Sequence, residues 1–156
     1  MERLLTIPNV HLEGLWFPRF EFERPEVQPD RLVAPEMEFE VEVLPGEGDK
    51  YAARISVKSD PDKQASFHLS VVARLEFALG RENADLPDET MKRFLRVNSL
   101  VLAWPYLREM ISSAAGRMGF PPLFLAMLDV SQIYSAFLTP EERERSEETE
   151  VVRQAE

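Results

Sequence analysis

The sequence predicts a protein of the α+β class, and two observations carry this prediction. Apolar and polar residues alternate with a period of two through the first two thirds of the chain, and helical patterns fill the last third. Strands and helices segregated in this way favour an antiparallel sheet with helices on its apolar face over repeated β–α units. With 156 residues, 44% of them hydrophobic, the chain is long enough for one domain with a substantial core.

Four segments are expected to form the strands of the antiparallel sheet. Three of them alternate between apolar and polar side chains, as strands with one buried face do. They span residues 36–43, 51–57 and about 66–79. Residues 10–23 predict a weaker strand, because Gly14 and Pro18 interrupt the pattern and favour a bulge or an edge position.

One strand carries a row of carboxylates on its polar face, at Glu36, Glu38, Glu40 and Glu42. The next strand presents Arg54 and Lys58, which are expected to face these carboxylates across an antiparallel pair. A Ca²⁺ site or a catalytic pair is the alternative. However, same-face residues of a flat strand lie about 6.8 Å apart, and Ca²⁺ loops need a curved backbone with carbonyl ligands. A solvated face of the sheet is the favoured interpretation.

The last third of the chain predicts two helices. The first starts near Asp88, with acidic residues in its first turn, and ends at Gly119. Pro105 lies in its middle and is expected to kink or break it. Asp129 can cap the second helix, which is expected to reach Leu138.

Composition excludes several classes of protein. The chain has 28 acidic and 18 basic residues, a net charge of −10 and no cysteine. This charge disfavours nucleic acid and anionic membranes as partners, and the lack of cysteine excludes disulfides and thiolate zinc sites. No apolar run approaches the roughly 18 residues that span a bilayer, and no secretory signal is recognised at the N-terminus. A cytoplasmic location without membrane insertion is therefore expected.

The sequence carries no signal for an enzyme. It lacks the glycine-rich nucleotide-binding motifs, the G-x-S-x-G nucleophile motif and the H-E-x-x-H zinc motif. His11 and His68 stand alone in predicted strands, where a histidine is more often a surface or packed residue than a base or a ligand. No catalytic residue, cofactor or metal is therefore predicted.

The connector between the two predicted helices, residues 120–128, is apolar where a loop is usually polar. A buried connector explains this pattern, and so does an exposed apolar groove that serves as an interaction site. The pattern alone leaves both explanations open.

The segment Trp-Pro-Tyr-Leu-Arg-Glu at residues 104–109 resembles the aromatic-Pro-Tyr-x-Arg-Glu segment of the SecB family of bacterial protein-export chaperones. The similarity continues through residues 120–125 and the second predicted helix. Residues 35–41 and 20–25 are similar to two strand segments of that family. The resemblance covers roughly residues 9–138 and is carried mainly by the helical stretch.

The resemblance implies a SecB-like domain over residues 1–138, followed by an acidic charged tail or helix over 139–156. It implies a four-stranded antiparallel sheet with two helices packed on one face, assembled as a homotetramer, a dimer of dimers. It also implies a holdase that binds unfolded preproteins without ATP. The implied client groove is lined by Met37, Phe39, Val41, Phe120, Leu123, Leu125, Tyr134, Phe137 and Leu138. Packing in a core between sheet and helices is the competing explanation for these residues.

The chain departs from the family at the face that contacts the export motor SecA. Glu23 matches an acidic contact position of the family, but Arg19, His68 and Ser70 stand at the other contact positions. Binding to SecA is therefore expected to be weak or absent. A SecB-like chaperone dedicated to an antitoxin is one alternative function, and a carrier of apolar small molecules is an alternative from another class.

Overall fold

The computed structural model of the chain describes residues 7, 9–27, 30–83, 87–121, 123 and 129. The chain divides into two units, Met1–Ala126 and Met127–Glu156, and all the helices and strands described lie in the first. In chain order they are β1 (Val10–Glu23), β2 (Met37–Pro45), β3 (Lys50–Ser59), β4 (His68–Leu79), a short 3₁₀ helix η1 (Arg81–Asn83) and α1 (Asp88–Arg117).

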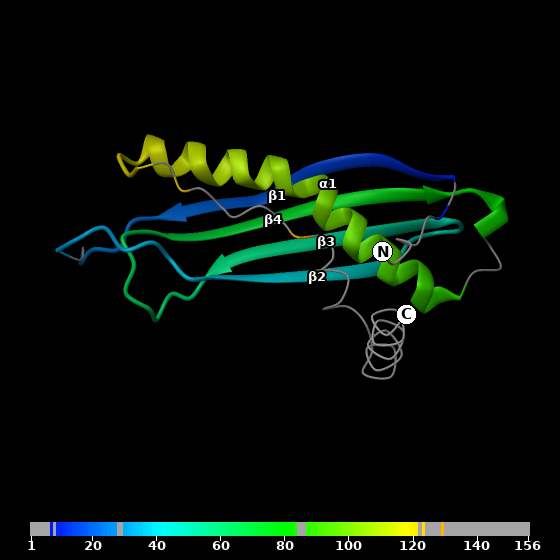
Figure 1. Ribbon diagram of the computed structural model, residues 1–156, viewed down its shortest axis with the longest axis horizontal. Helices are drawn as coiled ribbons and strands as arrows, with labels where there is room; N and C mark the ends of the chain where they lie inside the picture. Colours follow the sequence, from blue (N-terminus) through cyan, green and yellow to red (C-terminus); the bar gives the residue numbers. More distant parts are fainter. Residues whose placement is uncertain are drawn as a thin grey trace, which may run out of the picture. The chain divides into compact units, whose positions relative to one another are not determined.

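The four strands form one antiparallel sheet in the order β1-β4-β3-β2, so that β1 and β2 are its edges (Figure 1). The predicted irregularity of β1 is confirmed, because its register with β4 shifts between Leu12 and Gly14 and again between Trp16 and Arg19. The ring of Trp16 lies so close to Gly14 that a Cβ at position 14 would be 2.7 Å from it. Glycine at this position therefore allows the Trp16 ring to pack against the backbone.

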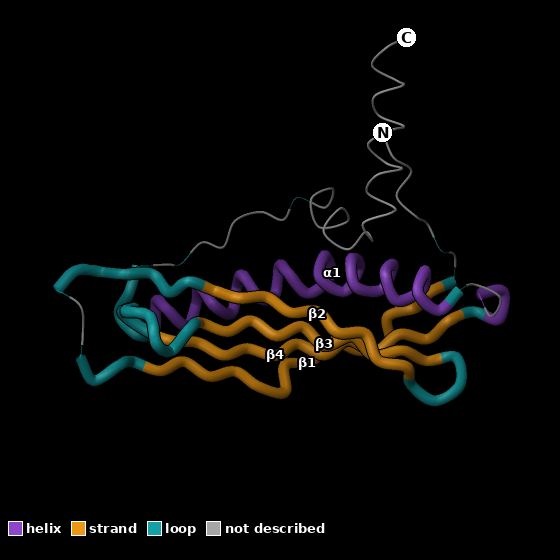
Figure 2. Tube along the Cα trace, turned by 90° about the horizontal axis from the view of Figure 1, so that it is seen from below, coloured by secondary structure: helices purple, strands orange, loops and turns teal. Residues whose placement is uncertain are grey.

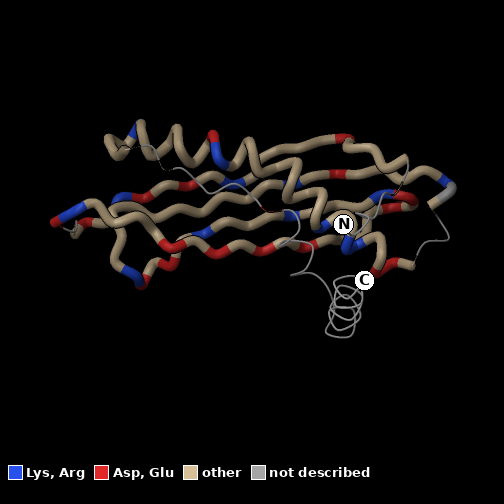
Figure 3. The backbone as a smooth tube through the Cα atoms, viewed as in Figure 1, with Lys and Arg blue, Asp and Glu red and all other residues tan. Residues whose placement is uncertain are grey.

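The hairpin between β2 and β3 sets the register of the acidic strand. The amide of Gly46 donates to the carbonyl of Lys50 at 2.8 Å, and Gly48 adopts a left-handed φ of 63°. This turn places Glu38 opposite Lys58 and Glu42 opposite Arg54, so the two cations face the row of carboxylates, as the sequence predicts. The carboxylates recur along β2 in Figure 3.

Helix α1 covers one face of the sheet, and the helix and the sheet form two layers (Figure 2). The helix runs obliquely from the β2 side of the sheet towards the β1 side (Figure 1). Along α1, every fourth residue is buried: Met91, Leu95, Ser99, Ala103, Leu107, Ile111 and Ala115. They face fully buried residues of the two central strands, among them Ile55, Val57, Val71 and Leu75. Because residues four apart share one side of a helix, this stripe holds α1 on the sheet.

Pro105 kinks α1 without breaking it, so of the two predicted outcomes, a kink or a break, the structure shows the kink (Figure 1). The assigned helix is continuous from Asp88 to Arg117, although its ribbon changes direction midway (Figure 1). Pro105 removes the hydrogen bond to the carbonyl of Val101, and both residues are exposed, so water can satisfy that carbonyl.

Within the described residues there is one α-helix, not the predicted pair. The four-stranded antiparallel sheet and a helix packed on one of its faces are as predicted. The second helix, predicted over residues 129–138, lies outside the described residues except for Asp129, which is not helical.

Candidate binding site along the edges of the helix-covered face

A single cross-strand row shows where α1 leaves the sheet uncovered. Phe39 of β2 is opposite Val57 of β3, Val57 is opposite Val71 of β4, and Val71 is opposite Phe20 of β1. The two valines at the centre are fully buried, whereas Phe39 is 44% exposed and Phe20 is 41% exposed. The centre of this face is therefore closed, and an aromatic side chain stays partly open to solvent on each edge strand.

On the β2 edge, three predicted groove residues form a continuous apolar strip. Met37, Phe39 and Val41 alternate with glutamates and share the helix-covered face, because period-two alternation places every second residue on the same side. Met37 and Val41 are half-buried, and burial becomes complete only at Val43, further along the strand. We call Met37, Phe39 and Val41 the β2 strip.

The β2 strip is supported from one side by α1. The ring of Phe39 lies 5.2 Å from the ring of Trp104, centroid to centroid, in a tilted arrangement at 53°. Trp104 is only 8% exposed, so it is held firmly while Phe39 presents its other face to solvent. An aromatic wall with a rigid back and an open front is suited to stacking or edge-on contact with an apolar side chain.

The C-terminus of α1 directs the predicted connector to a second aromatic cluster. The amide of Phe120 donates to the carbonyl of Ala115 at 3.0 Å, and the amide of Gly119 donates to that of Gly116 at 3.0 Å. Gly119 has a φ of 83°, so this end is a Schellman motif in which glycine supplies the left-handed residue. The motif reverses the chain and brings Phe120 back against the sheet.

Phe120 packs at the end of the sheet where β4 begins and β1 ends. Its ring lies 5.2 Å from that of Phe67, and the guanidinium of Arg24 is 5.4 Å from its centroid. Phe67 in turn stacks on Phe22 at 5.6 Å, and Phe22 contacts Phe20 at 5.3 Å. We call Phe20, Phe22, Phe67 and Phe120 the aromatic cluster.

The predicted groove residues are therefore placed in two regions. Met37, Phe39 and Val41 form the β2 strip, whereas Phe120 belongs to the aromatic cluster on the β1–β4 side, and Leu123 is half-buried. Leu125, Tyr134, Phe137 and Leu138 lie outside the described residues. Phe20, Phe22 and Phe67 were not predicted as site residues, although their alternating positions in the predicted strands indicated an apolar face.

The crossover between β1 and β2 is anchored to the sheet by one serine. The Ser66 hydroxyl accepts a hydrogen bond from the amide of Val33 at 2.9 Å, and the amide of Ser66 donates to the carbonyl of Val33 at 2.9 Å. Ser66 is buried, so these bonds satisfy groups that would otherwise be desolvated. The anchored crossover still leaves the side chains of Val27 and Leu32 exposed.

The face without the helix is polar and charged. Glu23 lies there directly opposite His68, and Ser70 is opposite Glu21. Nδ1 of His68 is 3.3 Å from the Ser59 hydroxyl, which also accepts a hydrogen bond from the amide of Leu69. Among the described residues, no group of three or more His, Asp or Glu side chains is arranged to hold a metal ion.

A family model described as preprotein translocase subunit SecB matches residues 8–140 of this chain. The chain belongs to the SecB family. Two curated members are similar along most of their length. The protein-export protein SecB of Anaplasma phagocytophilum is 27% identical, over 81% of this chain and 91% of its own. That of Caulobacter vibrioides is 29% identical, over 75% of this chain and 74% of its own.

The fold of a SecB-like chaperone is also found among solved structures. The Mycobacterium tuberculosis SecB-like chaperone, in complex with a ChAD peptide from the HigA1 antitoxin, aligns with a TM-score of 0.65. It is 19% identical, and the alignment covers 78% of this chain and 91% of that one. The SecB-like fold predicted from the helical motif is therefore confirmed. No helix in the described part of the chain is long and apolar enough to cross a membrane.

Proposed function

We propose that this SecB-family protein is an ATP-independent holdase that captures non-native polypeptides along the edges of its helix-covered face. The observation that carries this proposal is the row from Phe39 to Phe20, which is closed at its centre and open at both ends. Aromatic side chains of this size are usually buried, and partly exposed ones beside other apolar residues are typical of interaction surfaces.

The β2 edge suits an extended, unfolded segment as its ligand. As an edge strand, β2 has one side on which its backbone groups are not paired within the sheet. An extended client can add main-chain hydrogen bonds there while its alternate side chains contact the β2 strip. Met37 adds adaptability, because methionine is flexible and polarizable and accepts side chains of different shapes. A folded protein hides the same groups and is not bound.

Unfolded preproteins are the proposed clients, and an antitoxin is the second candidate. The names of the curated relatives support the first, and the antitoxin peptide bound to the M. tuberculosis chaperone supports the second. A carrier of apolar small molecules would need an open cavity between α1 and the sheet. That space is filled by fully buried side chains such as Ile55, Leu75 and Leu107, which argues against the carrier.

We further propose that the second helix over residues 129–138 completes the groove and that four chains assemble as a dimer of dimers in the cytoplasm. Tyr134, Phe137 and Leu138 would then supply the outer wall of the site, with Leu123 and Leu125 in the connector. Several short contacts with one long client raise the total affinity through effective concentration. An assembly that offers several grooves can therefore hold a client although each contact is weak.

The test compares Phe39→Ala with Leu44→Ala. Leu44 lies on the same strand and is 43% exposed, but it faces the helix-free side of the sheet. We expect Phe39→Ala to reduce suppression of aggregation of an unfolded test protein severalfold, because it removes the exposed aromatic contact. Leu44→Ala should hold the test protein like the parent.

Thermal unfolding of the same variants separates client binding from packing. Truncation of a fully buried phenylalanine to alanine costs about 3–5 kcal/mol of stability. Phe39 is partly exposed, so its truncation should cost much less. We therefore expect the melting temperature of Phe39→Ala to lie only a few degrees below that of the parent. If Phe39→Ala lost cooperative folding while the protein that remained folded captured clients normally, Phe39 would be a core residue and not a client contact.

We also expect binding to SecA to be weak or absent. Glu23 is an acidic residue on the helix-free face, as in the family. Its direct cross-strand neighbour is His68, however, and Arg19 lies on the same face. Calorimetric titration with SecA at low ionic strength measures this directly. Tight, salt-sensitive binding that disappears in Glu23→Lys would contradict the expectation.

A further inference from the structure

The helix-free face of the sheet carries a hollow of about 320 Å³, away from the proposed client site. The edge strands form its walls through Pro18 of β1 and Leu44 of β2. Val72 of the central strand β4 lies in its floor and is buried, although among the described residues no helix covers this side. The hollow is therefore apolar at its base.

Three arginines surround this apolar base. Arg54 and Arg74 are direct cross-strand partners on β3 and β4, and Arg19 of β1 is opposite Val72 in the adjacent row. Like charges directly opposite each other on a sheet repel. Glu42 opposite Arg54 and Glu76 paired with Arg74 reduce this repulsion, and an anion between or above the two guanidinium groups would reduce it further. Such a concentration of cations on a chain with a net charge of −10 indicates an anionic partner at this place.

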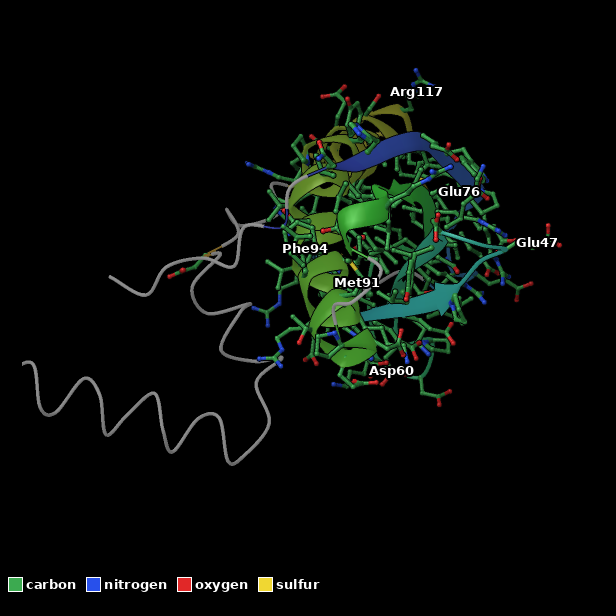
Figure 4. All side chains as sticks on the ribbon, turned by 90° about the vertical axis from the view of Figure 1, so that its right-hand side faces the viewer. Glu47, Asp60, Glu76, Met91, Phe94 and Arg117 are labelled. Atoms are coloured by element: carbon green, nitrogen blue, oxygen red, sulfur yellow. The ribbon has the colours of Figure 1, made fainter. Side chains whose placement is uncertain are left out.

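The neighbouring carboxylates leave these arginines available. Arg19 pairs with Glu21 at 2.8 Å and Arg74 pairs with Glu76 at 3.2 Å, but all four side chains are substantially exposed to solvent. Exposed ion pairs of this kind are weak and exchange readily with other anions. Figure 4 shows Glu76 on the side of the sheet away from α1.

Arg74 is also oriented by an aromatic ring. Its guanidinium carbon is 5.7 Å from the centroid of the Trp16 ring, which packs against Gly14. A guanidinium held over an aromatic face keeps its charge and its planar set of donors, and this set matches a carboxylate. Because the ring already restricts the Arg74 side chain, this side chain loses less conformational entropy when it binds a carboxylate.

We propose that this hollow binds an acidic segment of a partner polypeptide, with one apolar side chain seated over Val72 and flanking Asp or Glu carboxylates on Arg19, Arg54 and Arg74. A simple anion would use the arginines alone, whereas an acidic peptide with an apolar anchor uses the arginines and the apolar base together. The site lies on the face opposite the β2 strip, so it is independent of the proposed holdase function.

The experiment uses the full chain and a fluorescein-labelled peptide, Gly-Asp-Glu-Leu-Glu-Asp-Gly, with fluorescence anisotropy as the readout. We expect saturable binding in the micromolar range that weakens at least fivefold between 25 and 250 mM NaCl, because charge pairs on an open face are screened. Arg54→Gln combined with Arg74→Gln should weaken binding at least tenfold. Lys58→Gln, which removes a cation of the same face outside the hollow, should change binding less than twofold.

Two further comparisons identify the occupant. Replacement of the peptide leucine by serine should weaken binding severalfold, and Phe39→Ala should bind the peptide like the parent. Arg19→Gln provides a single exposed substitution in case the double variant does not fold, as judged by circular dichroism. The proposal is overturned if binding is absent or unaffected by the arginine substitutions. It is also overturned if the serine peptide binds equally well and 10 mM inorganic phosphate displaces both peptides, which would indicate a simple anion site.

Discussion

Phe39 and Phe20 lie at the two ends of a cross-strand row whose central residues, Val57 and Val71, are fully buried. All four side chains lie on the same face of the sheet, and the place of their strands, at its edges or in its centre, separates surface from core. Apolar area left in water forgoes about 25 cal/mol per Å² of stabilisation. A client or another copy of the chain that covers these two phenylalanines therefore gains binding free energy from their exposed apolar area.

Residues at the start of α1 make the stability of the helix depend on pH. The Tyr51 hydroxyl donates to one oxygen of Asp88 at 2.9 Å, and the ammonium of Lys92 pairs with the other at 2.5 Å. The hydrogen bond from Lys92, followed by that from Tyr51, holds the pKa of Asp88 below its ordinary value of 3.8. The lowered pKa means that folding favours the carboxylate over the carboxylic acid.

Asp88→Asn is expected to lower the melting temperature at pH 7, because it removes a negative charge from the first turn of the helix and from Lys92. With a lowered pKa in the folded state, the contribution of Asp88 is complete above pH 3.8 and is lost as the pH falls through the folded value. Melting curves from pH 7 to pH 3 should therefore show the parent and the variant converging. Glu47→Gln in the β2–β3 turn is the control, and a difference that persists unchanged at pH 3 would contradict the argument.

Helix α1 combines a helix-breaking residue with a well-formed end. Pro105 is tolerated because its missing hydrogen bond is on the solvent side, and the buried residues at every fourth position continue through it. The Schellman motif at Gly119 then turns the chain, so that Phe120 reaches Phe67. The direction in which the connector leaves the helix therefore depends on one glycine with a positive φ.

Two glycines near the end of α1 form a matched pair for testing this motif. Gly119 has a φ of 83°, whereas Gly116 is helical, and neither has an atom within 4 Å of an added Cβ. Gly119→Ala should destabilise the protein by about 1 kcal/mol, because alanine is strained in the left-handed region. Gly116→Ala should stabilise it by about 0.5–1 kcal/mol through helix propensity. Urea unfolding measures both, and equal effects of the two substitutions would refute the assignment of the motif.

The first unit of the molecule leaves apolar surface exposed on both layers. On α1, Val101, Leu102 and Tyr106 are exposed on the side away from the sheet core, and on the β1 edge Leu12 is exposed. A single helix on a four-stranded sheet cannot cover its own outer side or the two edges. Exposed apolar side chains of this kind on a small protein support the proposed assembly.

Light scattering is expected to give a mass near four times 18.0 kDa for the parent chain. Leu102→Glu combined with Tyr106→Glu should reduce this mass, because two charges on an apolar interface are costly to desolvate. Leu44→Glu, which adds charge on the helix-free face, should leave the mass unchanged. A parent that is monomeric at micromolar concentration would rule out the proposed tetramer.

The sequence by itself determined the four strands, the side of each strand that is apolar and the ends of the first helix. These features follow from local rules, since alternation, turn glycines and helix-end signals act over a few residues. The family was identified from the resemblance of residues 104–109 to a known segment. The sequence also predicted that Arg54 and Lys58 face the row of glutamates, whereas the individual pairs, Glu38 with Lys58 and Glu42 with Arg54, follow from the register of the hairpin. The sequence left open whether Pro105 kinks or breaks the helix, since that depends on whether this side of the helix faces water.

Only the tertiary structure decided which apolar residues are core and which are site. Phe39 and Val57 have the same sequence pattern, and their exposure differs because Phe39 lies on the edge strand β2, whereas Val57 lies on the central strand β3 between β2 and β4. The separation of Phe120 from the β2 strip and the meeting of Arg19, Arg54 and Arg74 were likewise invisible to local patterns. Both arise from the strand order β1-β4-β3-β2, which brings together segments far apart in the chain.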